Sequence, residues 1–311
     1  MTMDKNVLVI GSINVDYVIH TDRLPKLGET ITGRDFAMNF GGKGANQAVA
    51  IAKTGCSVKM LGAVGTDLSG DLAIGNLKKC GVDADSVLRV DAPTGAAVIT
   101  VCGGDNHIIL DVGANGYVTP ERVAEREDLF AWADVVVMQY EIPTESVIAA
   151  ARMAKERGKQ VIINPAPVKE VDAALYPYVD LMVPNEFEAQ LITGIAQNDD
   201  EDARAAIAKL REMGCKNAIV TLGGKGCAYG VGDDVHFAGI YEVERVDTTA
   251  AGDSFIGGIC SKLCEGWDLD RAVAYASAVS AITVSRPGAA ASIPVASEVE
   301  DFLKTHTIGD H

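Results

Sequence analysis

The chain lacks the long hydrophobic runs that would place it in a membrane. No apolar run in its 311 residues approaches the roughly 18 that a membrane-spanning helix needs. The apolar run at 6–10 is also too short for a secretory signal, and it is typical of a first buried strand. We therefore expect no membrane contact and, as the default, a location in the cytoplasm.

The chain also lacks paired cysteines. Its seven cysteines are an odd number, widely scattered, and contain no Cys-x-x-Cys pair. This pattern favours reduced core residues over a disulfide framework or a zinc site. The five histidines are equally dispersed, so the sequence indicates no Ser-His-Asp or Cys-His nucleophile.

Basic residues are in short supply. The 43 acidic residues exceed the 27 basic ones, and the formal net charge is −16. A nucleic acid or an anionic membrane surface is therefore an unexpected partner. A phosphate-bearing small molecule remains compatible with this charge if cations and backbone amides are concentrated in one site.

Strand-like and helix-like segments alternate along the chain. The strand-like runs are 6–10, 58–62, 134–138, 160–164, 180–184 and 217–221, and the helix-like segments include 69–79, 145–157, 202–213, 252–264 and 269–285. This rhythm predicts a mainly parallel sheet with helices on both faces. Ligands of such sheets bind beyond the carboxyl ends of the strands.

A second strand pattern interrupts this rhythm. The segments 94–102 and 107–112 are strand-like and are joined by GGDN, which predicts a hairpin. Together with a β-like stretch at 30–40 they predict a small sheet outside the main one. Such a sheet could act as a lid over a site.

The most informative segment is DTTAAGDSFIGG at 247–258. It places Asp253 in a small-residue turn that opens a helix, where the free amides and the positive end of the helix dipole attract an anion. A carboxylate there is suited to take a proton from a hydroxyl that attacks a phosphoryl group, while the small residues Ala250, Ala251 and Gly252 let that group approach the backbone amides that would stabilise it. The open alternative is that Asp253 only caps the helix.

Two further segments offer polar groups for a polyhydroxyl ligand. GGKGANQA at 41–48 lacks the spacing of a P-loop, but its glycines allow close approach, and Lys43 and Asn46 supply polar groups. Asn14 and Asp16 follow the first strand, which is not followed by a dinucleotide-binding Gly-x-Gly-x-x-Gly. The alternatives are a plain glycine-rich turn and a solvated Asn-Asp turn.

Two loops after strands favour a nucleotide and its metal. In PNEFE at 184–188, Asn185 and Glu188 could hold a hydrated magnesium ion, although a helix-start capping pattern explains the same residues. In TLGGKG at 221–226, the glycines would expose amides to phosphate and Lys225 would add charge. A type II turn also explains those glycines.

In order and spacing these segments resemble the ribokinase-like, phosphofructokinase B type family of carbohydrate kinases. The matching segments are GSINVD at 11–16, GGKGANQA at 41–48, QYE at 139–141, NPAP at 164–167, PNEFE at 184–188, TLGGKG at 221–226, DTTAAGD at 247–253 and RPGAAAS at 286–292. The resemblance implies one three-layer α/β domain over 1–311. It also implies a small β-sheet lid, formed by about 14–41 and 94–113, through which family members form homodimers.

The activity that the resemblance implies is transfer of a phosphoryl group from ATP to the primary hydroxyl of a sugar. We expect ribose, giving ribose 5-phosphate, with Asp253 as base and Ala250, Ala251 and Gly252 as anion hole. The implied sugar-binding residues are Asn14, Asp16, Gly42, Lys43, Asn46, Glu141 and Asp253. The implied nucleotide-binding residues are Asn185, Thr221, Gly223, Lys225, Gly226 and Gly252.

The resemblance also implies two kinds of cation. Glu188 would belong to the Mg²⁺ network. An activating monovalent cation such as K⁺ would be held by a pair of loops, several of whose residues act through backbone oxygens. The residues of that loop pair are Asp247, Thr249, Thr283, Arg286, Gly288 and Ser292.

Some positions do not identify which nucleotide or which sugar is bound. Family members often place a His or an Asn against adenine, where this chain offers Ser277 or Ser280. The lid residues Ala96, Ile109 and Asp111, expected to border the sugar, do not separate ribose from deoxyribose, a ketose or a nucleoside. A sugar-sensing protein without catalysis is a further alternative, but it predicts loss of the base, and the AAGD sequence is intact.

Overall fold

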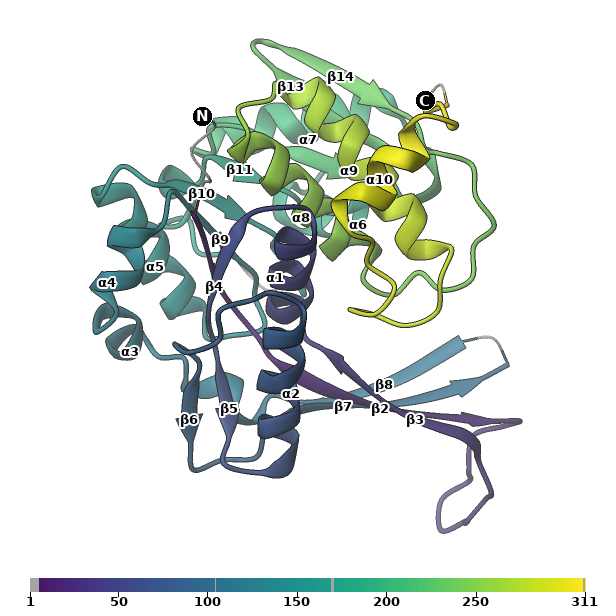
Figure 1. The fold of residues 1–311 in the computed structure, drawn as a ribbon. Coiled ribbons are helices and arrows are strands. Elements are labelled where there is room, and N and C mark those ends of the chain that lie inside the picture. The colour runs from purple at the N-terminus through teal and green to yellow at the C-terminus, as the bar shows by residue number, and fades with distance from the viewer. Residues whose placement is uncertain (1–5, 104, 169–170, 310) are drawn as a thin grey trace.

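A mainly parallel sheet forms the centre of the computed structural model, which describes residues 6–103, 105–168, 171–309 and 311 (Figure 1). Five strands run parallel in the order β11-β10-β9-β1-β4. Their bounds are β1 Asn6–Ile10, β4 Ser57–Leu61, β9 Val135–Met138, β10 Gln160–Ile163 and β11 Leu181–Met182.

Three more strands continue the sheet beyond β11. They are β12 Ile219–Thr221, β13 Cys227–Val231 and β14 Asp234–Ala238, which pair antiparallel with one another. The amide of Thr221 donates to the carbonyl of Pro184 at 3.0 Å, and parallel bridges join Met182 of β11 to Ala218 and Asn185 to Thr221 of β12. The carboxyl ends of β11 and β12 therefore lie side by side.

Alternating side chains of the central strands enter two separate cores. In β1, Val7 and Val9 pack into one core and Leu8 and Ile10 into the other, as expected for a strand that is buried on both faces. The first core is covered by α1 Lys43–Lys53, α2 Leu68–Lys79, α8 Ala251–Cys264 and α9 Leu269–Val284. The predicted sheet with helices on both faces is confirmed.

The second core is covered from the opposite face. Its helices are α3 Pro120–Ala124, α4 Glu127–Trp132, α5 Thr144–Glu156, α6 Glu186–Thr193 and α7 Asp200–Glu212. The last helix, α10 Ala296–Leu303, packs outside α9. Within the described ranges no helix combines the length and the apolar composition of a membrane span.

A four-stranded sheet projects from this layered body (Figure 1). Its strands are β2 Asn14–Thr21, β3 Arg34–Gly41, β7 Gly95–Cys102 and β8 Asp105–Asp111, in the order β3-β2-β7-β8. The predicted hairpin of β7 and β8 is confirmed, and Gly104 of its turn lies outside the described residues. A short parallel pair, β5 Ala63–Gly65 and β6 Leu88–Val90, lies at the base of the body.

Candidate active site

Asp253 lies in the first turn of α8, but it does not cap that helix. The N-cap is Ala250, whose φ of 62° makes a left-handed turn. The Asp253 carboxylate, 7 % exposed, accepts hydrogen bonds from Asn46 Nδ2 at 3.1 Å and from Gln47 Nε2 at 3.0 Å. The capping alternative is therefore wrong, because the carboxylate is bound by two residues of α1, which are 206 and 207 residues away in the sequence.

The turn before α8 leaves amides free to bind an anion. The amide of Ala251 donates to the Thr248 carbonyl at 3.2 Å, whereas in the part of the chain that the structure describes the amides of Gly252 and Asp253 have no acceptor. The hydroxyls of Ser254 and Ser280 donate to the Ala251 carbonyl at 2.9 and 3.2 Å and so fix the turn. Free amides at a helix start attract a negatively charged group.

A chain of side-chain amides orients the Asp253 carboxylate. Gln47 Nε2 also donates to Asn164 Oδ1 at 3.2 Å, and Gln139 Nε2 donates to Gln47 Oε1 at 2.5 Å. Asn164 in turn donates to the Val183 carbonyl. Gln47, Gln139 and Asn164 were not among the expected site residues, although they lie in the segments GGKGANQA, QYE and NPAP. The position of Gln47, four residues after Lys43 on one helix, was the available signal.

A cavity of about 230 Å³ opens beside Asp253, lined among others by Lys43, Asn164, Asn185 and Glu188. Burial lowers the pKa of Lys43, but the negative charges of Asp253, Glu141 and Glu188 outweigh it and leave that pKa above its usual value. Lys43 is therefore a retained positive charge among three carboxylates. Its charge offsets part of the negative charge that these carboxylates place in the cavity.

The PNEFE segment forms a capping box at the start of α6. The Asn185 side chain accepts from the Glu188 amide, and Glu188 Oε2 accepts from the Asn185 amide, each at 2.9 Å. The capping interpretation is confirmed. It does not exclude the magnesium interpretation, because Glu188 also lines the cavity, and its burial raises the pKa of its carboxyl.

The carboxyl end of β1 brings several of the expected sugar-binding residues together. Glu141 Oε2 accepts from the Lys43 amide at 2.9 Å and from Ser12 Oγ at 2.5 Å. Asn14 is buried, and its Oδ1 accepts from Asn115 Nδ2 at 2.7 Å. Ser12 and Asn115, which position Glu141 and Asn14, were not among the expected site residues. The alternative of a solvated Asn-Asp turn is wrong, because Asn14 and Asp16 lie on strand β2.

Asp16 is held close to the glycines of GGKGANQA. A Cβ added to Gly41 would lie 2.2 Å from Asp16 Oδ2, so the carboxylate occupies the room that glycine leaves. Gly42 follows with a φ of 88°, which strains any other residue type. Burial, and then the nearby charge of Glu141, raise the pKa of Asp16 to about 6. These glycines therefore do more than form a plain turn.

The register of the projecting sheet corrects the expected lid contacts. Asp16 pairs with Ala97, and Ala97 pairs with Leu110, so these three side chains share one face of the sheet. Ala96, Ile109 and Asp111 lie one residue out of step and belong to the opposite face. The prediction that they border the sugar is wrong, since side chains of a strand alternate between its faces. Leu110 instead lines a cavity of about 330 Å³ together with Asn14 and Glu141.

Asn46 provides a buried acceptor that the protein does not satisfy. Its Nδ2 contacts Asp253, while its Oδ1 is buried and has no hydrogen-bond partner in the described part of the chain. Buried polar atoms are almost always paired, so an unpaired one calls for an explanation. A hydroxyl of a bound substrate would supply the missing donor.

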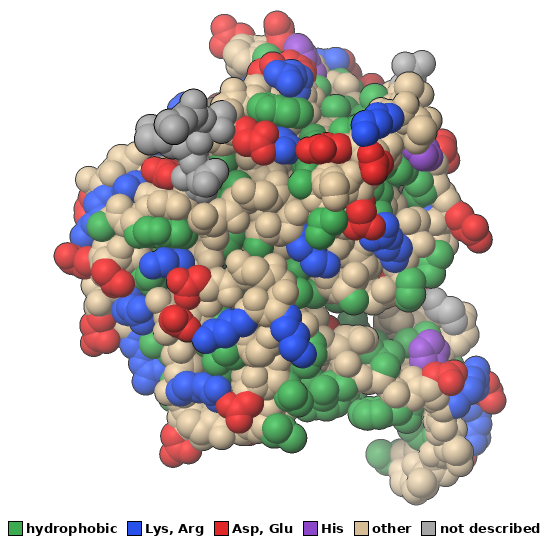
Figure 2. Space-filling view, in the orientation of Figure 1, with side chains coloured by type: hydrophobic (Ala, Val, Ile, Leu, Met, Phe, Trp, Pro, Cys, Tyr) green, Lys and Arg blue, Asp and Glu red, His purple; other side chains and the backbone are tan. Residues whose placement is uncertain are grey.

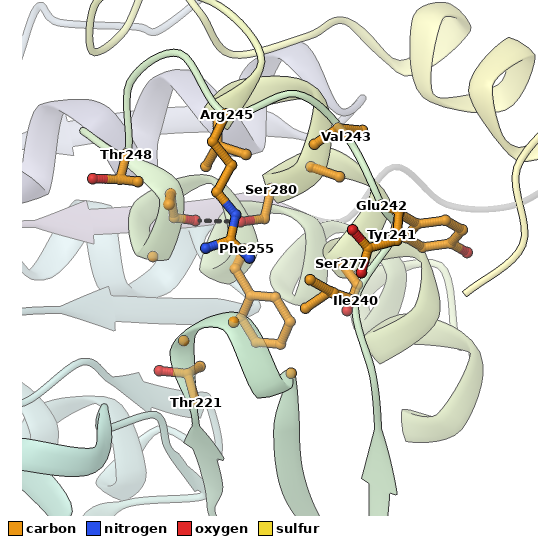
Figure 3. A pocket seen from close by; sticks show the side chains of 17 residues that line it. Thr221, Ile240, Tyr241, Glu242, Val243, Arg245, Thr248, Phe255, Ser277 and Ser280 are labelled. Carbon is orange, nitrogen blue, oxygen red and sulfur yellow. Dashed lines mark hydrogen bonds between the residues drawn. The ribbon is translucent and has the colours of Figure 1, made fainter. Parts of the chain in front are cut away.

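A third cavity, of about 320 Å³, lies on the other side of the turn before α8 (Figure 3). Figure 3 shows Thr221 and Thr248 on one side of it and Ile240, Tyr241 and Val243 on the other. Its lining includes the small or polar residues Thr221, Gly223, Gly224, Gly226, Ala251 and Gly252, and the apolar residues Ile240, Tyr241, Val243, Ala281 and Val284. Ser277 and Ser280 also line it, as expected. Gly223 and Gly224 belong to a 3₁₀ turn, Gly223–Lys225, in which Gly223 has a φ of 55°.

Two of the expected nucleotide-binding residues do not line this cavity. Asn185 lines the cavity of Asp253, and Lys225 lines a neighbouring one with Asp199, Asp200 and His311. The imidazole of His311 contacts the Lys225 carbonyl at 2.8 Å. The positive charge in the third cavity belongs to Arg245, which the sequence analysis did not select.

Asp247 joins the two loops that were expected to hold a monovalent cation. Its carboxylate accepts from the Thr249 amide at 2.9 Å and from the Gly288 amide at 3.0 Å. Partial burial raises the pKa of Asp247, but these hydrogen bonds outweigh it and leave that pKa below its usual value. A carboxylate that stays ionised and fixes two loops suits the neighbourhood of a cation.

The side chains of the other expected cation-site residues have different hydrogen-bond partners. The hydroxyls of buried Thr283 and Ser292 donate to the carbonyls of Val279 and Ala289. The Arg286 guanidinium points away to Glu298, at 2.7 Å. Arg286 can therefore serve a cation only through its backbone carbonyl.

With this geometry in hand, comparison with known proteins identifies the family. Residues 4–296 match the sequence model of the pfkB family of carbohydrate kinases. The chain belongs to that family. It is an ATP-dependent carbohydrate kinase with the α/β fold and the small additional sheet of its relatives.

Three relatives of this carbohydrate kinase illustrate the match. The ribokinase of Schizosaccharomyces pombe is 39 % identical over 307 residues, which cover 95 % of this chain and 96 % of the relative. A deoxyribokinase of Salmonella typhi is 35 % identical over 301 residues, 96 % of this chain and 98 % of the relative. The structure of Arabidopsis thaliana ribokinase complexed with ribose and ATP superposes with a TM-score of 0.93 at 34 % identity, covering 97 % of this chain and 99 % of that chain.

Proposed function

We propose that this kinase transfers the γ-phosphoryl group of ATP to the primary hydroxyl of ribose, giving ribose 5-phosphate. The observation that carries the proposal is Asp253, whose buried carboxylate lies beside free amides and lines the cavity of Lys43, while its neighbours Ala251 and Gly252 line both that cavity and the one of the glycine turn. The cavity with Lys43 and Asp253 receives the sugar hydroxyl, and the cavity with the glycine turn receives ATP. The complex of the Arabidopsis relative with ribose and ATP supports this choice of ligands.

The chemistry assigned to the chain is positioning and proton transfer. Asp253 accepts the proton of the attacking hydroxyl, while Asn46 and Gln47 hold the carboxylate in place. The amides at the start of α8 stabilise the charge of the transferring group. Glu141, Asn14, Asp16 and Asn46 bind the remaining hydroxyls, and Lys43 adds a positive charge.

The residues around Glu188 fit a hydrated magnesium ion. One oxygen of this buried carboxylate is bonded to the Asn185 amide, while the side chain lines the cavity of Asp253. Mg²⁺ typically keeps several waters and takes one or two carboxylates, so such a site is sufficient. When bound, the ion neutralises charge on the ATP phosphates.

We also assign K⁺ activation to the loop pair of Asp247 and Gly288. Asp247 fixes the loop that carries the amides, and a cation among the backbone oxygens of these loops would stiffen it further. Omitting K⁺ is therefore expected to lower kcat more than it raises the KM for the sugar. Steady-state kinetics in K⁺ and in tetramethylammonium salts of equal ionic strength measure both constants.

The exposed hydrophobic residues of the projecting sheet support a homodimer through the lid. Phe36, Met38, Val98 and Ile109 share the face opposite Asp16, and each is at least 40 % exposed. Figure 2 shows hydrophobic side chains gathered along this sheet, and a hollow where the sheet meets the body. We further propose that the sheet covers the bound sugar as a lid. The protein would act in the cytoplasm, where ATP is available. Light scattering that gives the mass of one chain would exclude the dimer.

A coupled assay of ADP release tests the proposed substrate. The screen covers ribose, deoxyribose, fructose and adenosine at equal concentrations with ATP and Mg²⁺. The expected result is the highest kcat/KM with ribose. Deoxyribose is the second candidate because of the deoxyribokinase relative, and a clear preference for it or for adenosine would overturn ribose as the substrate.

The pH dependence of sugar binding follows from Asp16. Its pKa is raised to about 6, so the carboxylate is ionised above that pH and loses one acceptor oxygen to a proton below it. We expect the KM for ribose to rise as the pH falls through 6, while kcat at saturating ribose changes less. The Asp16→Asn variant has no such titration, and a wild-type KM that is flat between pH 5 and 7 would contradict the assignment.

A further inference from the structure

The third cavity contains one cation with no protein partner. Arg245 lies in the segment between β14 and α8 and lines the cavity beside the glycine turn. Among the residues that line it, Arg245 alone is a lysine or an arginine. Within the described ranges its guanidinium makes no hydrogen bond and no ion pair, although Glu242 lines the same cavity and Glu244 is its neighbour in sequence.

The guanidinium lies against Gly224 across the cavity. A Cβ added to Gly224 would be 3.1 Å from Arg245 Nη2 and 3.5 Å from Nη1, so a larger residue at 224 would meet the arginine. Figure 3 shows the Arg245 side chain reaching into the cavity from the loop that also carries Thr248. The group therefore lies near the glycine and amide end of the cavity.

The chemistry of that end favours a phosphate over a base. Gly224 and Gly252 offer free backbone amides there, whereas Ile240, Tyr241 and Val243, whose apolar side chains suit a base, lie on the other side of the cavity (Figure 3). A guanidinium can donate two parallel hydrogen bonds to phosphate oxygens. In a chain of net charge −16, a local cation is also needed to attract a polyanion.

We infer that Arg245 is a nucleotide-binding residue whose guanidinium pairs with the phosphate groups of ATP. On binding, it leaves Gly224 and contacts the polyphosphate from the open side of the cavity. The inference rests on the proposed use of ATP, and it adds a residue outside the DTTAAGD and TLGGKG segments. It also supplies the charge that Lys225, which faces another cavity, does not.

Calorimetric titration of ATP, ADP and adenosine without sugar tests the inference. Because the guanidinium is partly solvated, Arg245→Gln is expected to raise the Kd of ATP and ADP about tenfold and to leave that of adenosine unchanged. Arg245→Lys keeps the charge without the paired donors, so its Kd for ATP should lie between those of the wild type and of Arg245→Gln. The matched control is Arg152→Gln, which removes the same charge from an exposed position on α5.

Each outcome decides the question. Unchanged ATP binding in Arg245→Gln would overturn the inference, and equal weakening of ATP and adenosine would show that the guanidinium stacks on the base instead. A wild-type protein that binds ATP through Arg245 but does not phosphorylate ribose would overturn the proposed substrate and leave the inference intact. Melting curves of both variants exclude unfolding as a cause.

Discussion

Replacing Asp253 with Asn is expected to lower kcat by at least about 100-fold, because the amide cannot accept the proton of the sugar hydroxyl. The amide is close to the carboxylate in size and still accepts one of the bonds from Asn46 and Gln47. The Kd of ATP should therefore change by less than about threefold, since only a base that acts during transfer is removed. Steady-state assays and titration of ATP measure the two effects.

Asp202→Asn is the matched control for this variant. Asp202 occupies the third position of α7, as Asp253 does in α8. Its carboxylate accepts a hydrogen bond from the exposed amide of Asn198. Its loss should leave kcat unchanged. An Asp253→Asn enzyme with wild-type turnover would remove this carboxylate from the mechanism.

Replacing Asp16 with Ala is expected to raise the KM for ribose by about 100-fold, because two hydrogen bonds from sugar hydroxyls to a charged acceptor are lost. The Kd of ATP should stay the same, since Asp16 lies on β2 and the ATP cavity lies beyond α8. Sugar and ATP titrations distinguish the two sites.

The stability of the same variant gives an independent check. The raised pKa of Asp16 means that the fold disfavours its ionised form, so this charge destabilises the protein at neutral pH. Asp16→Ala should therefore not melt earlier than the wild type. Asp22→Ala removes an exposed carboxylate paired with Arg34 and should leave the KM for ribose unchanged. A KM for ribose within threefold of the wild type in Asp16→Ala would exclude Asp16 from the sugar site.

The layered fold could be predicted because local signals agree with the tertiary structure. Strand-like and helix-like runs alternate, and helices predicted at 252–264 and 269–285 are observed at Ala251–Cys264 and Leu269–Val284. Asp253 could be selected because its small-residue turn is visible in one short segment. The contacts that orient it could not, since Gln47 and Asp253 are 206 residues apart.

The predictions that were wrong concern the direction in which side chains point. Ala96 and Ile109 are neighbours of Ala97 and Leu110 in sequence, and a shift of one residue moves a strand's side chains to the other face. Lys225 belongs to the expected turn, but only the turn's geometry determines that its side chain faces a different cavity. Arg245 carries no sequence signal, because its importance depends on Gly224 lying opposite.

The position of the transferred phosphoryl group tests the central claim most directly. Phosphorus and proton NMR of the product formed from ribose and ATP show which oxygen is esterified, and a single-turnover experiment with Asp253→Asn measures the transfer step itself. The account predicts a phosphate on the C5 oxygen and transfer that is at least about 100-fold slower in the variant. A phosphate on the anomeric oxygen, or equal transfer rates in the two proteins, would contradict it.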